Sequence, residues 1–210
     1  RANTTLQNHM RDTPCTASVV NGNLIILKSL LQHVDDSMRF EHINTSFMIA
    51  CCNNQKAIFE YLLACGANIN FQDDQLSRDT ALMGAARTGN LEIVQLLLQH
   101  GANIDLQGRD GFTALRYAAN FRKPDVVAFL LRSGANVKLG STSPPWDILT
   151  MAIRIQAVDV IRVLLPYIAD LHTDMGIELQ LRLGSQSPEI TQMIRNEIER
   201  RQMEQQDIRI

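Results

Sequence analysis

Apolar residues recur along the chain in short groups that are separated by glycine, asparagine and other polar residues. The clearest group, residues 91–98, reads Leu-Glu-Ile-Val-Gln-Leu-Leu-Leu and has apolar side chains on more than one helical face. A helix of this kind is usually buried between neighbouring elements. Before it, Thr80 opens a shorter segment whose Ala85 and Ala86 let another helix approach closely, and Gly89 breaks it. The pattern predicts a pair of short antiparallel helices.

This helix pair is repeated along the chain. The triplet Gly-Ala-Asn begins at Gly66, Gly101 and Gly134, at spacings of 35 and 33 residues. Glycine supplies the left-handed cap that ends a helix, and the polar residues after each triplet predict a hairpin-like loop. The period is marked by a second anchor, because three threonines each lie 21 residues before a triplet glycine: Thr45, Thr80 and Thr113.

A unit of about 33 residues with two helices and a hairpin-like loop resembles the ankyrin repeat. The match is strongest from Thr80 to Asn103 and from Thr113 to Asn136. The resemblance implies an all-α fold, an α-solenoid of stacked helix-turn-helix units joined by β-hairpin-like loops, which we call fingers.

We expect an N-terminal tail over residues 1–10, a repeat domain over 11–202 and a C-terminal tail over 203–210. The domain then divides into six units, the last of them a cap: 11–42, 43–77, 78–110, 111–144, 145–174 and 175–202.

Several positions depart from the family pattern. In the fifth unit Ile168 stands where the capping glycine is expected and Pro166 interrupts the last turn, which predicts a remodelled helix end. The second finger is two residues longer than the third. The His of the family signature is replaced in four units, and we expect packing to compensate for its lost hydrogen bond: Met48, Met83, Arg116 and Thr150.

The capping unit is predicted from one amphipathic stretch near the C-terminus. Its apolar stripe comprises Ile190, Met193, Ile194 and Ile198. The charged side chains between them are expected to face water: Arg195, Glu197, Glu199, Arg200 and Arg201.

Composition limits the possible classes of function. Of 210 residues 45% are apolar and 20% charged, which is sufficient for a folded, soluble chain. The net charge of −2 gives no general attraction to phosphate backbones, so we expect no nucleic-acid partner. The apolar runs are far too short to span a bilayer, so we expect no membrane association. We also expect the chain to be a monomer. Because the sequence begins at Arg1 instead of Met, we expect it to be part of a longer protein.

The four cysteines form no C-x-x-C pair, which favours a reducing compartment. We expect the cytoplasm or nucleus, or the host cytosol if the chain belongs to a secreted effector. Cys51 aligns with Ala86 and Cys15 with Leu82, so both predict buried, inert thiols. Cys52 aligns with Arg87 on the exposed rim and is expected to be the most accessible thiol.

No catalytic constellation is visible in the sequence. The five histidines are scattered, and there is no H-E-x-x-H, P-loop, G-x-S-x-G or dinucleotide-binding motif. We therefore expect no enzyme activity, no cofactor and no metal within the chain.

The resemblance implies that a partner binds the concave face, made of the fingers and the exposed side of the first helices. Aromatic and arginine side chains dominate interface hot spots, and several fall on this predicted face. The arginines favour an acidic partner. An alternative is that Phe112 and Trp146 only pack over neighbouring units. The candidate residues, flanked by Leu76, Asp79, Thr88 and Ile155, are Arg87, Arg109, Asp110, Phe112, Arg116, Tyr117, Asn120, Phe121, Trp146, Met151 and Arg154.

The favoured hypothesis is a non-catalytic module that binds a protein or peptide. The alternative is a targeting or regulatory part of a larger enzyme or bacterial effector, whose catalytic domain lies outside these residues. Asn70 also resembles the finger asparagines that are hydroxylated in many ankyrin proteins, which makes it a lesser candidate for modification.

Overall fold

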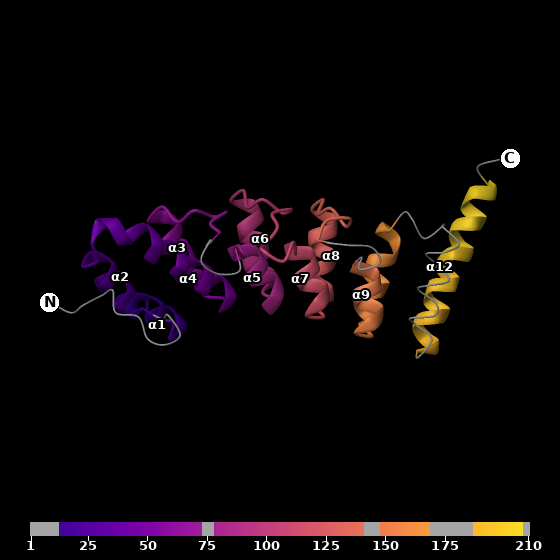
Figure 1. The fold of residues 1–210 in the computed structure, drawn as a ribbon, viewed down its shortest axis with the longest axis horizontal. Helices are drawn as coiled ribbons and strands as arrows, with labels where there is room; N and C mark the ends of the chain where they lie inside the picture. The colour runs from indigo at the N-terminus through magenta and orange to yellow at the C-terminus, as the bar shows by residue number, and fades with distance from the viewer. Residues whose placement is uncertain (1–12, 73–77, 141–147, 169–186, 208–210) are drawn as a thin grey trace.

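The helices stack side by side in one elongated row, with the two ends of the chain at opposite ends of it (Figure 1). The computed structural model describes residues 13–72, 78–140, 148–168 and 187–207. Within these ranges the regular structure is entirely helical, with no strand. The prediction of an all-α solenoid is confirmed.

Each of the first five repeats contributes two helices. The first helices pack on one another along the row, α1 on α3, α3 on α5, α5 on α7 and α7 on α9. They are α1 (Pro14–Val20), α3 (Asp36–Cys52), α5 (Ala81–Thr88), α7 (Ala114–Asn120) and α9 (Ile148–Arg154). The second helices are α2 (Leu24–Gln32), α4 (Lys56–Ala64), α6 (Leu91–Gln99), α8 (Pro124–Arg132) and α10 (Val158–Leu164).

Small side chains set the spacing between first helices. Ala85 and Ala86 are fully buried on α5, as are Ala118 and Ala119 on α7. At Gly84 a Cβ atom would lie 2.4 Å from the Cys52 Sγ atom of the preceding repeat, so even one added carbon would collide. The predicted close approach of the first helices is confirmed, and larger residues there would force the repeats apart.

Threonine caps open the first helices at two of the predicted anchors. The Thr80 and Thr113 hydroxyl groups each accept a hydrogen bond from the backbone N–H three residues on, both at 3.3 Å. Thr45 differs, because it lies inside α3 and its hydroxyl donates to the Glu41 carbonyl at 2.8 Å. Residues 36–52 contain no glycine or proline, so the helix starts at Asp36 and runs through the position where a finger would end.

The position of the signature His is buried in three of the four units, and Met48 is half-buried in the other, so the expected packing is found in three units. Met83 and Thr150 are each 1% exposed. Met83 also restores a polar contact, because its Sδ atom accepts a hydrogen bond from the Thr80 backbone N–H at 3.3 Å.

Successive fingers are joined by a ladder of side-chain to backbone hydrogen bonds. The backbone N–H groups of Asn103 and Asn136 are donated to a side-chain oxygen of the preceding finger, whereas that of Asn68 is donated to Asn44 on α3 of its own repeat. The side-chain oxygen of each triplet asparagine accepts the N–H two residues further on, which fixes the turn of the finger. Two of these bonds join repeats, Asn103 to Asn70 at 2.8 Å and Asn136 to Asp105 at 2.9 Å, and the bond from Asn68 to Asn44, at 2.7 Å, lies within the second repeat.

The turn between the two helices of each repeat contains one left-handed residue. Glycine takes this position in two repeats, at Gly22 and Gly89, with φ of 67° and 87°. Three repeats place a side chain there, at Asn54, Arg122 and Gln156, with φ of 56°, 54° and 52°. Asparagine tolerates this conformation, whereas arginine and glutamine are strained in it.

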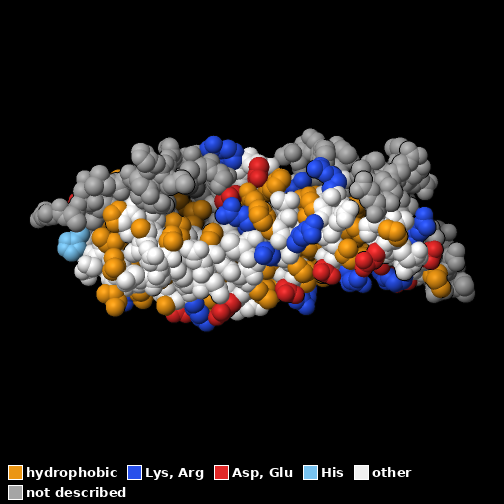
Figure 2. Space-filling view, turned by 90° about the horizontal axis from the view of Figure 1, so that it is seen from below, with side chains coloured by type: hydrophobic (Ala, Val, Ile, Leu, Met, Phe, Trp, Pro, Cys, Tyr) orange, Lys and Arg blue, Asp and Glu red, His pale blue; other side chains and the backbone are white. Residues whose placement is uncertain are grey.

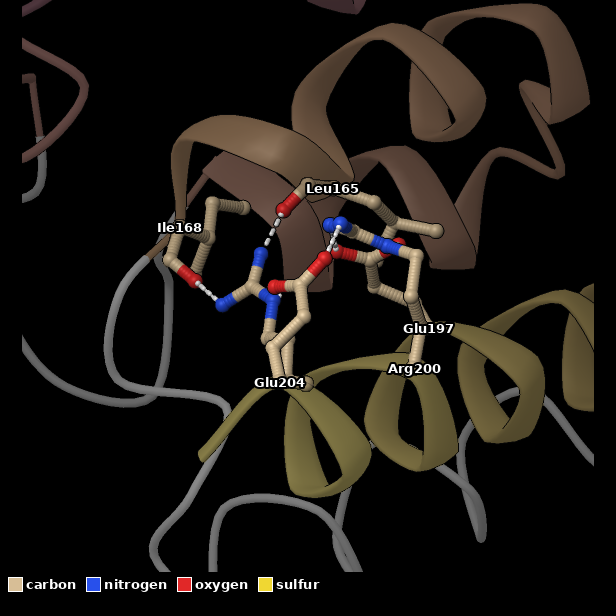
Figure 3. Close-up of polar contacts among 6 residues, drawn as sticks. Leu165, Ile168, Glu197, Arg200 and Glu204 are labelled. Carbon is tan, nitrogen blue, oxygen red and sulfur yellow. Dashed lines mark hydrogen bonds and ion pairs between the residues drawn. The ribbon is translucent and has the colours of Figure 1, made fainter. Parts of the chain in front are cut away.

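The fifth repeat ends differently, as predicted. The 3-10 helix η1 (Leu165–Tyr167) replaces the last turn of α10, and Ile168 is extended at φ −98°. The carbonyl groups of Leu165 and Ile168 turn toward the last helix, α12 (Pro188–Asp207) (Figure 3). Arg201 of α12 donates hydrogen bonds to both, so a side chain satisfies carbonyl groups that a regular cap would have covered.

Helix α12 closes the C-terminal end of the row. Ile190 and Ile194 are buried, as the predicted stripe requires. The expectation that Glu197 and Arg201 face water is wrong, because their side chains are only 13% and 11% exposed and form an ion pair at 2.8 Å. Arg201 has turned toward the carbonyl groups of Leu165 and Ile168, and Glu197 accepts a hydrogen bond from it. Helix α12 also continues to Asp207, into the segment that the sequence suggests is a tail.

Replacing Gln156 by glycine should raise the free energy of unfolding by about 0.5–1 kcal/mol, because glycine removes the left-handed strain at some cost in backbone entropy. The same change at Asn54 is the control and should have a smaller effect. Urea unfolding followed by circular dichroism measures both. A Gln156→Gly variant that is no more stable than the parent would contradict this account of the turns.

Candidate functional site

The third finger is a tight hairpin-like loop that places two of the candidate residues. Its ends are tied by a hydrogen bond from the Gly108 N–H to the Phe112 carbonyl, at 3.0 Å. Gly111 has φ of 77°, which a residue with a side chain would resist. The Asp110 carboxylate accepts the Phe112 N–H at 2.9 Å. The predicted reversal is present, and it holds Asp110 and Phe112 beside helix α7.

Five residues then form what we call the finger cluster: Asp79, Asp110, Phe112, Arg116 and Tyr117. The Tyr117 hydroxyl oxygen lies 3.0 Å from a carboxylate oxygen of Asp79 and 3.1 Å from one of Asp110. A phenol has one hydrogen, so it donates to one carboxylate at a time. Burial and these two carboxylates raise the pKa of Tyr117 well above its usual value. One side chain of α7 therefore links the second finger to the third.

The aromatic rings of the finger cluster pack against each other and against an arginine. The Phe112 and Tyr117 rings meet edge to face with centroids 5.6 Å apart. The Arg116 guanidinium lies 4.5 Å from the Phe112 ring centroid, in a cation–π contact. The Phe112 ring is thus held on two sides while it stays half-exposed.

The expectation that Arg116 and Met151 lie at the surface is wrong. Arg116 is 6% exposed and Met151 is 9% exposed. Arg116 occupies the signature position, where Met83 and Thr150 are also buried. A Cβ at Gly140 would lie 3.1 Å from the Arg116 Cδ atom, so the stem of Arg116 is packed beneath the next finger.

Three further candidates occupy equivalent positions at the C-terminal ends of α5, α7 and α9. We call Arg87, Asn120 and Arg154 the rim row. Arg87 and Arg154 are exposed and Asn120 is half-exposed. Phe121 follows Asn120 and is 46% exposed. Arg109, at the third finger, is exposed as well.

Basic side chains are concentrated over the middle and C-terminal parts of the face shown in Figure 2. Acidic side chains mostly follow one edge of that face, and the N-terminal third carries few charges. Trp146 and Leu76, which the sequence also suggests, lie outside the described residues.

A glutamine ties the second finger to the third. The Gln72 amide donates to the carbonyl of Arg78 at 2.7 Å, and to the carbonyl of Gln107 in the next finger at 2.8 Å. Asn70, the lesser candidate for modification, is half-buried, and its side-chain oxygen accepts the Asn103 N–H. Both residues therefore hold the fingers in register.

The cysteines follow the predictions in part. Cys15 and Cys51 are buried, and burial raises the pKa of Cys15 to about 11 and that of Cys51 well above its usual value. Cys52 is not the most accessible thiol, because Gly84 lets the next helix cover it, and burial raises its pKa against the opposing effect of Arg87. The exposed thiol is Cys65, at the C-cap of α4.

The sequence pattern does not predict one aromatic pair that the structure contains. Phe40, on the early turns of α3, is exposed and meets Phe71 of the second finger edge to face, with centroids 5.9 Å apart. Phe40 faces the second finger only because α3 starts early, and no periodic signal marks that start.

The described ranges contain no group of His, Cys, Asp and Glu side chains that could hold a metal ion. None of the helices in these ranges combines the length and apolar character that crossing a bilayer requires.

A family model described as ankyrin repeats (3 copies) matches residues 1–73 and again residues 47–141, together more than half of the chain. The chain belongs to the ankyrin repeat family. Ankyrin repeats are generally protein-interaction modules, and the ankyrin fold is typically non-catalytic.

Known ankyrin proteins are similar to parts of this array. The human ankyrin repeat and KH domain-containing protein 1 is 37% identical over 73 residues, which are 35% of this chain and 3% of that protein. Palmitoyltransferase AKR1 of Lachancea kluyveri is 37% identical over 71 residues, 34% of this chain and 10% of the enzyme. The curated relatives are matched over 3% to 32% of their own length.

Among solved structures, the human ASB11 ankyrin repeat domain aligns with a TM-score of 0.72 at 26% sequence identity. The alignment covers 93% of this chain and 87% of that one. The ankyrin architecture therefore extends well beyond the residues that the family model matches.

Replacing Tyr117 by phenylalanine should lower the free energy of unfolding of this ankyrin array by about 1 kcal/mol. The variant keeps the ring contact with Phe112 and loses only the bonds to Asp79 and Asp110, so the two fingers lose a shared tether. Urea unfolding gives the loss of stability. The matched control is Tyr167→Phe, on an exposed side chain of η1, and an equal effect of both changes would argue against the tether.

Proposed function

We propose that this chain is a non-catalytic interaction module that binds a protein or peptide through the concave groove of the array. In this proposal the site is centred on the third and fourth repeats and comprises the finger cluster and the rim row. The observation that carries the proposal is the Tyr117 hydroxyl between the carboxylates of Asp79 and Asp110. These hydrogen bonds hold the second and third fingers and the Phe112–Tyr117 pair in place before a partner binds.

Preorganisation favours binding because less side-chain entropy is lost when the partner docks. Phe112 is supported by the edge of Tyr117 and by the Arg116 guanidinium, so its half-exposed ring is a rigid apolar anchor. Phe121, exposed at the C-cap of α7, adds a second aromatic surface. Rigid aromatic groups of this kind are typical of interface hot spots.

Charge favours an acidic segment in the partner. Arg87, Arg109 and Arg154 are exposed around the finger cluster, and arginine forms paired hydrogen bonds with carboxylates and phosphates. Arg116 is not assigned this role, because it is buried against Phe112. In this proposal the chain acts as a monomer in the cytoplasm or nucleus, or in the host cytosol if it belongs to an effector.

A second candidate function is favoured by the lengths of the relatives. The curated relatives are matched over a minor part of their length, and one of them is named a palmitoyltransferase. The array would then be the targeting or regulatory arm of a longer enzyme, and the groove would present that enzyme to its substrate. The full coding sequence distinguishes the two, since the second candidate requires a catalytic domain in the same gene product.

The groove is tested by changing two exposed residues, Arg87 of the rim row and Phe121. A variant with Arg87→Ala and Phe121→Ala should lose at least about tenfold in affinity for the natural partner, because two hot-spot contacts are removed. The measurement is affinity capture with quantitative mass spectrometry, followed by titration calorimetry with each captured protein.

The matched control carries Arg132→Ala and Tyr167→Ala, which remove the same kinds of side chain from exposed positions outside the groove. Circular dichroism checks that both variants fold. A partner that binds the groove variant and the control with equal affinity would place the binding surface elsewhere.

A further inference from the structure

The first repeat exposes an apolar position that every later repeat buries. Ile26, the third residue of α2, is 49% exposed. Helix α2 contacts α1 of its own repeat and α3 of the second repeat. The equivalent residues on α4, α6, α8 and α10 are 2%, 0%, 1% and 1% exposed: Ile58, Ile93, Val126 and Val160.

Two more positions of the first repeat show the same difference. Leu30 is only half-buried, whereas its equivalents are fully buried on all four later second helices. Ala17 is exposed on α1, whereas the equivalent Gly84 is buried and would clash with Cys52 of the preceding repeat if it had a Cβ. The last comparison identifies the missing neighbour, because this position faces the repeat before it. What the first repeat lacks is a preceding helix pair.

The other end of the array is closed. Helix α12 buries Ile190 and Ile194 and presents Arg195, Asn196 and Glu199 to solvent. Terminal repeats of a stable solenoid need such a polar outer face. The N-terminal end carries apolar side chains in its place, and Figure 2 shows them gathered at that end of the molecule.

The sequence before α1 has the register of a finger. Residues 11–13 read Arg-Asp-Thr, and residues 78–80, which lie 67 positions later, read the same. Asn3 has the same offset from Asn70, the residue that receives the bond from the next finger. The ankyrin family match also reaches back to residue 1. In this register, the second helix that precedes a finger falls upstream of Arg1.

We propose that the N-terminal face of the first repeat, formed by Ala17, Ile26 and Leu30, is a stacking surface. Its occupant is a further ankyrin-type helix pair of the same polypeptide, upstream of the sequence that precedes α1. The face continues the series of interfaces between repeats that runs through the array. Burial of Ile26 by that helix pair would give it the environment that its four equivalents already have.

Thiol labelling tests the proposal, because burial protects a cysteine from reagents. Ile26→Cys is introduced with Cys65→Ser, which removes the exposed native thiol. The control is Ile25→Cys, whose equivalents Ala57, Glu92, Asp125 and Asp159 are exposed in every later repeat. Each is made in the 210-residue chain and in the full-length product of the same gene.

In the 210-residue chain both cysteines should react at comparable rates. In the full-length product Ile26→Cys should slow by at least about tenfold while Ile25→Cys keeps its rate. Equal rates for the two cysteines in the full-length product would overturn the proposal. Protection of Ile26→Cys that grows with the concentration of the 210-residue chain would also overturn it, and would assign the face to a second copy.

Discussion

The array depends on one hydrogen bond that is repeated along the finger side. The backbone N–H groups of Asn103 and Asn136 are donated to a side-chain oxygen of the preceding repeat, at 2.8 and 2.9 Å, whereas that of Asn68 is donated at 2.7 Å to Asn44 within its own repeat. The side-chain oxygens of the same asparagines accept the N–H two residues further on and fix the turns of their own fingers. Each repeat therefore needs its neighbour, and stability arises between repeats instead of in one core.

The register of the fingers in turn places the candidate site. Asp79 and Asp110 belong to different fingers, and both reach Tyr117 only because the fingers are held one repeat apart. Gln72 adds a second tie between the same fingers. The edge-to-face rings of Phe112 and Tyr117 lie at the centre of this arrangement. The geometry of the proposed groove therefore follows from the contacts that hold the solenoid together.

The repeat and its helices were predictable because glycine, asparagine and threonine mark them at fixed spacing. The early start of α3 was not, because residues 36–52 contain no breaker and Thr45 matched the threonine anchor without capping a helix. Arg116 was expected at the surface, although Met83 and Thr150, the residues at the equivalent positions of other repeats, indicated a buried position. The burial of Cys52 was not predicted, because it depends on Gly84 of the next repeat, whose missing side chain lets α5 pack against the thiol.

The most direct test of the central claim is amide hydrogen exchange at Asn103, which donates to Asn70 across repeats. Asn70→Ala removes the acceptor, whereas Asn70→Asp keeps one, as Asp105 does in the next finger. The account predicts that Asn70→Ala exposes the Asn103 amide to exchange and lowers the free energy of unfolding by about 1 kcal/mol, with Asn70→Asp close to the parent. An Asn103 amide that is equally protected in Asn70→Ala and the parent would contradict it.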